Sequence, residues 1–144
     1  LTFLGLGELY ANGNKDPAET RSFSGNRITS DPLRFQRNGE VMRLAPDLSI
    51  GGPTISWIYA ACKAMEFVQK PEFMATITTP MLLVASGDDR VVSSAKIEEY
   101  GTRLRSGAHT LVPGAKHELF QERDLYREQL LAAIDAFLPG SDDR

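Results

Sequence analysis

The sequence predicts an α/β fold with a parallel sheet in the second half of the chain. The segment 80–86 is a short continuous apolar run, as expected of a strand that is covered on both faces, and 108–114 is predicted to be a second strand that Pro113 and Gly114 close. Each of the two is followed by a segment with apolar residues at helical spacing, at 93–107 and at 122–140. This strand-helix-strand-helix order indicates parallel strands joined by a helical crossover.

The composition is typical of a globular protein and argues against several classes of function. The 144 residues are 42% hydrophobic and 24% charged, which is enough for one domain with a core. Sixteen basic residues are scattered among nineteen acidic ones, so no nucleic-acid partner is expected. The single Cys62 excludes an intrachain disulfide, and no Cys and His spacing predicts a metal site. One thiol without a disulfide favours a cytoplasmic location.

Residues 1 to about 70 contain helical patterns and no clear strand. In the first helical segment, Thr29 or Ser30 is the candidate N-cap, because both residue types accept hydrogen bonds from free backbone N–H groups. Pro32 suits the first helical position, and Pro46 closes the segment. These features predict a helix that begins just after the sequence "ITSDP".

A second helix is predicted between Thr54, as its N-cap, and Pro71, which stops it. Cys62 lies on its apolar stripe and is expected to be a small core residue rather than a nucleophile. The larger apolar residues of this helix are expected to pack within the first part of the chain and to offer an apolar surface to a ligand: Trp57, Tyr59, Met65 and Phe67.

Three polar residues follow the two predicted strands. Asp88 and Asp89 come after the first strand, and His117 comes after the second. Ligands of open parallel sheets bind at the carboxyl ends of the strands, so an acid and a histidine placed there can meet. A carboxylate fixes the imidazole tautomer when His acts as a base. In the alternative interpretation, His117 is an ordinary loop residue and the two acids cap the next helix. Because the acids and His117 both follow the ends of predicted strands, the interpretation as a functional acid–histidine pair is favoured.

Two stretches, "TPMLLVASGDDRVVSSAKIEEY" and "LVPGAKHELFQERD", resemble the C-terminal part of α/β-hydrolases of the lysophospholipase and monoacylglycerol lipase group, the serine aminopeptidase-like branch. In that group an acid lies in a G-x-x-D-x-[VI]-V loop, and a His in a G-x-x-H loop that is often followed by a Glu near the next helix. The earlier "NRITSDP" resembles the N-x-x-T-S-D-P opening of the helical cap. The resemblance implies a partial α/β-hydrolase fold, with a cap at 1–75 and the last strand-helix-strand-helix units of the core at 76–144.

The same resemblance selects between the two acids. Asp89 followed by Arg90, Val91 and Val92 fits the D-x-V-V register, so Asp89 is the expected triad acid and His117 the expected base. Gly87 departs from the register, since it lies two rather than three residues before Asp89. Asp88 therefore remains the fallback, with a turn and helix-capping role as its alternative.

The nucleophile elbow of that group, Ser in G-x-S-x-G, does not occur in this sequence. None of Ser24, Ser56, Ser86 and Ser93 has the paired flanking glycines. The first residue is Leu rather than Met, so we expect a piece of a longer protein whose N-terminal half carries the nucleophile Ser and the oxyanion hole. Because two strands cannot form an independent sheet, this piece should depend on that partner half.

Two classes of function follow. The first is a serine hydrolase of acyl esters such as a lysophospholipid or a monoacylglycerol, with no cofactor and with peripheral contact at the membrane. A carboxylesterase or a peptidase would use the same triad, whereas an epoxide or haloalkane hydrolase would carry Asp at the elbow. The second class is a non-catalytic hydrolase remnant that acts as a binding or regulatory module. The upstream sequence would discriminate between them.

Overall fold

The computed structural model describes residues 5–11, 22–48 and 51–138, and contacts divide it into two compact units. The described residues up to Asn26, together with Gln36–Met74, form the first unit. Arg27–Phe35 and the described residues from Ala75 onward form the second unit. The segment 27–35, which was expected to belong to the cap, thus packs with the predicted core. That the first unit serves as a cap remains a prediction.

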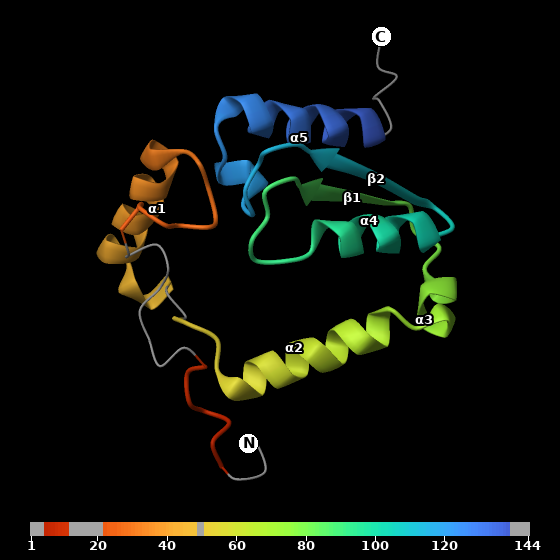
Figure 1. Cartoon of the computed structure of the whole chain (residues 1–144), viewed down its shortest axis with the longest axis horizontal. Helices are drawn as coiled ribbons and strands as arrows, with labels where there is room; N and C mark the ends of the chain where they lie inside the picture. Colours follow the sequence, from red (N-terminus) through yellow and green to blue (C-terminus); the bar gives the residue numbers. More distant parts are fainter. Residues whose placement is uncertain (1–4, 12–21, 49–50, 139–144) are drawn as a thin grey trace. The chain divides into compact units, whose positions relative to one another are not determined.

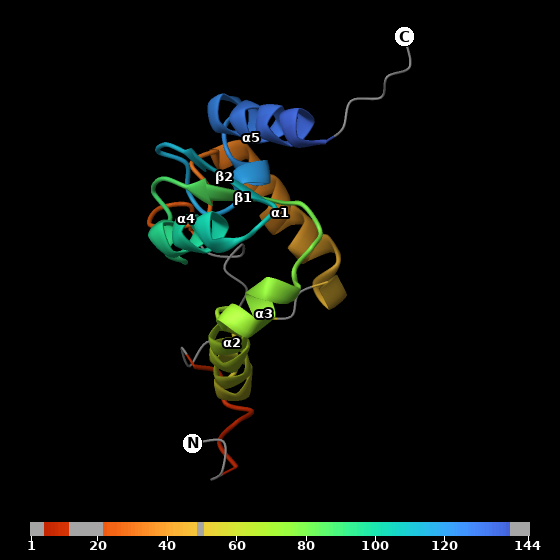
Figure 2. The same ribbon diagram turned by 90° about the vertical axis from the view of Figure 1, so that its right-hand side faces the viewer.

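The second unit contains the predicted parallel sheet. Strands β1 (Met81–Ser86) and β2 (Gly107–Val112) pair in parallel, with Met81 opposite Gly107 and Ser86 opposite Val112. Helix α4 (Ser94–Arg103) connects them, and α5 (Asp124–Phe137) follows β2 after the short 3-10 helix η4 (Leu119–Gln121). Helices α4 and α5 cover opposite faces of the two strands (Figures 1 and 2). The predicted α/β class and the partial hydrolase-like order are therefore confirmed.

The core of this unit lies between the sheet and α5. Val112, Ala115, Leu119 and Leu130 are all less than a tenth exposed and pack together. Half-buried Val84, Tyr126 and Ile134 pack against this cluster. Leu125, in the first turn of α5, is 68% exposed and lies outside this core.

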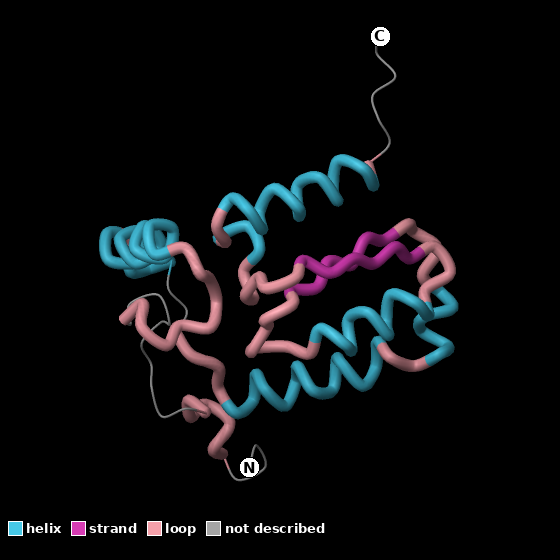
Figure 3. Tube along the Cα trace, turned by 45° about the horizontal axis from the view of Figure 1, so that its top comes forward, coloured by secondary structure: helices cyan, strands magenta, loops and turns pink. Residues whose placement is uncertain are grey.

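The first unit consists of most of α1 (Pro32–Leu44), the 3-10 helix η3 (Pro46–Leu48), α2 (Ile55–Val68) and most of α3 (Pro71–Thr76). Thr54 caps α2 as predicted, since its hydroxyl accepts a hydrogen bond from the Trp57 N–H at 3.2 Å. The N-cap of α1 was predicted wrongly. Asp31, rather than Thr29 or Ser30, accepts hydrogen bonds from the free N–H groups of the first turn. Figure 3 traces these helices along the chain.

The expected burial of the α2 stripe is wrong, because no residue of this helix is buried in the described structure and Cys62 is exposed. Helical spacing shows that a helix has an apolar side, but it does not show what covers that side. The exposed fraction of Trp57 is 62% and that of Tyr59 is 56%. Among the described helices, none combines the length and hydropathy needed to cross a bilayer.

Candidate active site

The loops that follow β1 and β2 are joined by backbone hydrogen bonds. The Gly87 N–H donates to the Val112 carbonyl at 2.9 Å, and the Asp88 N–H donates to the Ala115 carbonyl at 2.8 Å. The backbones approach so closely that a Cβ added to Gly87 would lie 2.7 Å from the Gly114 nitrogen. Only glycine fits at this position, and the close contact places the acid loop beside the histidine loop.

The two loops bring Asp89 and His117 together. The Asp89 Oδ2 atom lies 2.9 Å from the Nδ1 atom of His117, within hydrogen-bond distance. The other carboxylate oxygen, Oδ1, accepts hydrogen bonds from the N–H groups of Val91 at 2.7 Å and Val92 at 3.0 Å. The side chain of Asp89 is only 3% exposed, and that of His117 is 33% exposed. The backbone thus fixes the carboxylate, and the carboxylate fixes the imidazole.

Asp88 points elsewhere. Its side chain is 45% exposed and its carboxylate pairs with the Arg90 Nε atom at 3.3 Å. The expectation that Asp88 helps to cap the next helix is wrong, because Ser93 is the N-cap of α4 and accepts a hydrogen bond from the Lys96 N–H. Of the two neighbouring acids, the geometry brings Asp89 to the histidine and leaves Asp88 at the surface.

The surroundings of Asp89 favour its ionised form. Burial raises the pKa of this carboxyl, but hydrogen bonds from the Val92 N–H, from His117 and from the Val91 N–H lower it by more. The net pKa therefore lies below the ordinary value of 3.8. A carboxylate that stays charged can orient the imidazole and stabilise an imidazolium at neutral pH.

This lowered pKa predicts a pH dependence of stability. Ionised Asp89 stabilises the folded state above the unfolded-state value of 3.8, and this contribution is lost as the pH falls through the lower folded-state pKa. We expect the difference in unfolding free energy between the wild type and Asp89→Asn to shrink as the pH falls below about 5 and through the lowered folded-state pKa. Denaturant unfolding across this range measures it, and a constant difference would contradict the assignment.

The bond through Nδ1 decides which atom of His117 can react. When Nδ1–H donates to Asp89, the other ring nitrogen, Nε2, is the basic one. The imidazole also borders an open, mostly apolar cleft of about 650 Å³ in the second unit. The cleft is lined by residues of β1, the His117 loop, η4 and α5: Leu82, Val84, His117, Glu118, Leu119, Phe120, Gln121, Leu130, Ile134 and Phe137.

Other candidates contribute less to this site. His109 is exposed on β2, and its Cβ lies 2.8 Å from the position that a Cβ on Gly101 of α4 would take. Glu118 is half-buried, and its backbone N–H donates to the Ile28 carbonyl. Within the described ranges, no group of three His, Cys, Asp or Glu side chains could hold a metal ion.

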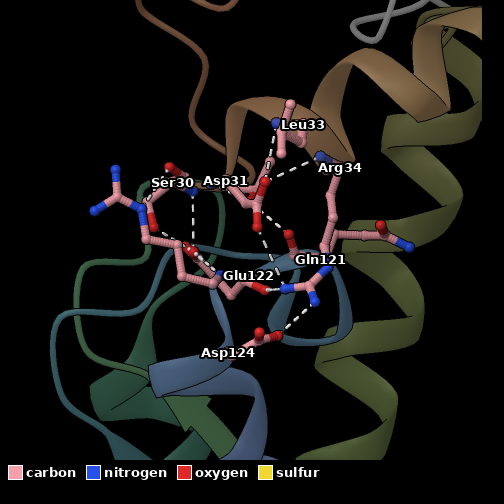
Figure 4. Close-up of polar contacts among 9 residues, drawn as sticks. Ser30, Asp31, Leu33, Arg34, Gln121, Glu122 and Asp124 are labelled. Atoms are coloured by element: carbon pink, nitrogen blue, oxygen red, sulfur yellow. Dashed lines mark hydrogen bonds and ion pairs between the residues drawn. The ribbon is translucent and has the colours of Figure 1, made fainter.

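Sequence reasoning missed one buried acid beside the histidine loop. Glu122 is completely buried and binds the segment before α1 through Ser30 (Figure 4). The motif "TSDP" and a Glu five residues after His117 were both visible in the sequence. Nothing in the sequence pattern shows that residues about ninety positions apart are in contact.

The family model described as serine aminopeptidase, S33, matches residues 16–124 of this chain. The chain belongs to this family of α/β-hydrolases. The family that the sequence resemblance predicted is therefore confirmed, and the relatives in this family are hydrolases.

Two curated relatives of this S33 chain are lysophospholipases. The probable lysophospholipase L2 of Haemophilus influenzae is 25% identical over 96% of this chain and 43% of its own length. The lysophospholipase L2 of Escherichia coli K12 is 29% identical over 80% of this chain and 35% of its own length. The S33 chain thus spans less than half the length of these relatives.

A solved structure supports the fold. A soluble variant of the monoglyceride lipase of Saccharomyces cerevisiae, in complex with a substrate analogue, superposes with a TM-score of 0.60. The match covers 77% of the S33 chain and 39% of the lipase, at 16% sequence identity. At this identity the likeness concerns the fold alone.

Proposed function

We propose that this chain supplies the acid and the base of a Ser-His-Asp triad in a hydrolase of carboxylic esters. The bond between Asp89 and the Nδ1 atom of His117, at 2.9 Å, carries the proposal. It leaves Nε2 to take the proton of a serine hydroxyl during attack on the ester carbonyl, and to return it to the leaving alcohol. The ionised Asp89 stabilises the imidazolium between these two steps.

The nucleophile is proposed to lie in an N-terminal part of a longer protein. The relatives are more than twice as long as the region that they share with this chain, which leaves room for that part. Among the described residues, β1 has a strand partner at one edge only, so another strand can pair with its second edge. The apolar cleft beside β1 offers a surface against which further core elements can pack.

The proposed substrates are lysophospholipids or monoacylglycerols. The names of the relatives support an ester of one acyl chain, and the curated relatives specifically support a lysophospholipase. Such a substrate lies in a membrane or a micelle, so we expect a cytoplasmic enzyme with peripheral contact at the membrane. The reaction needs neither a metal nor an organic cofactor.

The isolated 144-residue chain is expected to show no ester hydrolysis, whereas the protein at its natural length should hydrolyse a lysophospholipid or a monoacylglycerol. The reason is that catalysis needs a nucleophile and an oxyanion hole in addition to the acid and base. Fatty-acid release by both proteins, with and without a serine-directed phosphonate, measures this.

Two results would change the proposal. Phosphonate-sensitive turnover by the isolated chain would place the nucleophile among its own serines. Absence of turnover by the folded, natural-length protein would instead favour the alternative, a hydrolase remnant that acts as a binding or regulatory module.

A further inference from the structure

Glu122 is a completely buried acid that the proposed triad does not use. Its exposed fraction is 0%, although Glu is almost never fully buried unless its charge is compensated. It lies just after η4 and two residues before α5, in the segment that continues from the His117 loop. A carboxylate in such a place requires hydrogen-bond donors on both of its oxygens.

The structure supplies these donors from two distant parts of the chain. The Oε2 atom accepts hydrogen bonds from the Ser30 N–H at 3.0 Å, from the Ser30 hydroxyl and from the Arg123 N–H at 3.1 Å. The Oε1 atom accepts a hydrogen bond from the Lys116 N–H at 2.8 Å. One carboxylate therefore joins the segment before α1 to the residue that directly precedes His117 (Figure 4 shows its link to Ser30).

Further bonds between the same two segments surround this carboxylate. The hydroxyl of Thr29, which is 1% exposed, donates to the Gln121 carbonyl at 2.7 Å. The Arg123 Nε atom donates to the Ser30 carbonyl at 3.0 Å. At the periphery, Arg34 pairs with the 70%-exposed Asp124 at 2.5 Å. The segment 29–34 is thus also bonded directly to the segment 121–124, which follows the His117 loop.

We propose that Glu122 is a positioning residue of the triad: clamped by Ser30, its carboxylate holds the backbone at Lys116 and thereby fixes His117 opposite Asp89. The inference rests on the proposed function. His117 is anchored on one side by Asp89, through its ring, and on the other by Glu122, through the N–H of the preceding residue, Lys116. The acceptor in these hydrogen bonds is the Glu122 carboxylate. Hydrogen bonds to a carboxylate are stronger than hydrogen bonds to the carbonyl of a neutral amide.

Two substitutions in the protein at its natural length test whether Glu122, held by Ser30, positions His117. Glu122→Gln keeps the shape but places an NH2 group on one side of a carboxyl site that is surrounded by donors. Ser30→Ala removes one hydroxyl donor and leaves the backbone N–H, so it preserves the fold even if Glu122→Gln does not. We expect turnover of the acyl ester to fall, by about a hundredfold for Glu122→Gln, with KM little changed, because misplacement of a catalytic group affects the reaction step. Ser30→Thr, which restores the hydroxyl, should recover turnover.

A spectroscopic measurement separates positioning from mere stabilisation. The His117 Nδ1–H proton, held by Asp89, should give a slowly exchanging imidazole signal in NMR of protein labelled with ¹⁵N-histidine. The signal is assigned as the one that His117→Ala removes. In Ser30→Ala and Glu122→Gln it should shift or broaden by exchange, while circular dichroism reports an intact fold.

Asp124→Asn is the matched control. It also changes a carboxylate to an amide and weakens a link between the same two segments, through Arg34, which also donates to the Glu122 backbone carbonyl. It leaves the donors to the Glu122 carboxylate, and the Lys116 N–H among them, in place. Turnover and the His117 signal should stay as in the wild type. An unchanged His117 signal in folded Ser30→Ala would overturn the positioning role. Equal effects of Asp124→Asn and Glu122→Gln would also do so, since the contact between the segments would then act only through stability.

The NMR measurement does not depend on turnover. If His117→Ala remains active, the proposed function fails, but a His117 signal that responds to Ser30→Ala still supports the clamp. If His117→Ala is inactive and the signal ignores Ser30→Ala, the proposed function stands and the positioning role fails.

Discussion

His117→Ala is expected to lower turnover by the natural-length protein on the order of a million-fold, as removal of the histidine does in a comparable triad. The variant lacks the Nε2 atom that would accept the serine proton and return it to the leaving alcohol. The side chain is one third exposed on a loop, so the fold should persist. Turnover on a lysophospholipid and on a monoacylglycerol is the measurement, with thermal unfolding as the check on folding.

His109→Ala is the matched control for that variant. His109 is the other histidine of the chain and is exposed on β2, away from the strand end. Its replacement should leave turnover unchanged. A folded His117→Ala protein that keeps its activity would show that the sequence "GAKHE" does not hold the base.

Asp89→Asn should produce the second largest loss, about ten-thousand-fold in turnover, by analogy with the acid-to-amide change in a comparable triad. The amide can still accept the N–H bonds of Val91 and Val92, so the loop should keep its shape. An amide group facing Nδ1, however, favours the wrong imidazole tautomer and supplies no charge to stabilise the imidazolium. The loss should appear mainly in kcat, because Asp89 acts on the base rather than on the substrate.

Asp88→Asn is the control for the acid. It makes the same chemical change one residue earlier, on a side chain that is 45% exposed and paired with Arg90. Since exposed ion pairs contribute little, we expect normal unfolding and nearly normal turnover. If Asp88→Asn were inactive and Asp89→Asn active, the two acids would exchange roles.

The α/β fold class could be predicted because it follows from local patterns of apolar residues along the chain. A continuous apolar run at β1, a second segment of strand length at β2 and helical spacing between them specify parallel strands without knowledge of any distant contact. The expected burial of both strands is wrong for β2, where Ala108, His109 and Leu111 are exposed.

The caps of α1 and α2 show how far such reasoning extends. Thr54 caps as predicted, but among three adjacent polar residues the cap of α1 is Asp31. The hydroxyls of Thr29 and Ser30 bond to Gln121 and Glu122 instead of capping the helix. These distant partners cannot be seen in the local sequence.

The candidate pair was predictable for a similar reason. Parallel strands end at the same edge of a sheet, so residues that follow neighbouring strands are brought together by topology alone. The choice between Asp88 and Asp89 depended on a family register that Gly87 breaks. The structure separates the two acids physically: one is held by the Val91 and Val92 N–H groups against the imidazole, and the other points to solvent.

The α/β class, the position of Asp89 and His117 at two strand ends and the resemblance to an S33 hydrolase could all be predicted from the residue pattern. What is buried around Asp89 and His117 emerged only from the folded chain. The fold left Cys62 exposed and no residue of α2 buried, and it buried Glu122 completely against Ser30. The physical reason is that periodicity is a property of neighbouring residues. Burial of a carboxylate depends instead on donors that the fold brings from about ninety residues away.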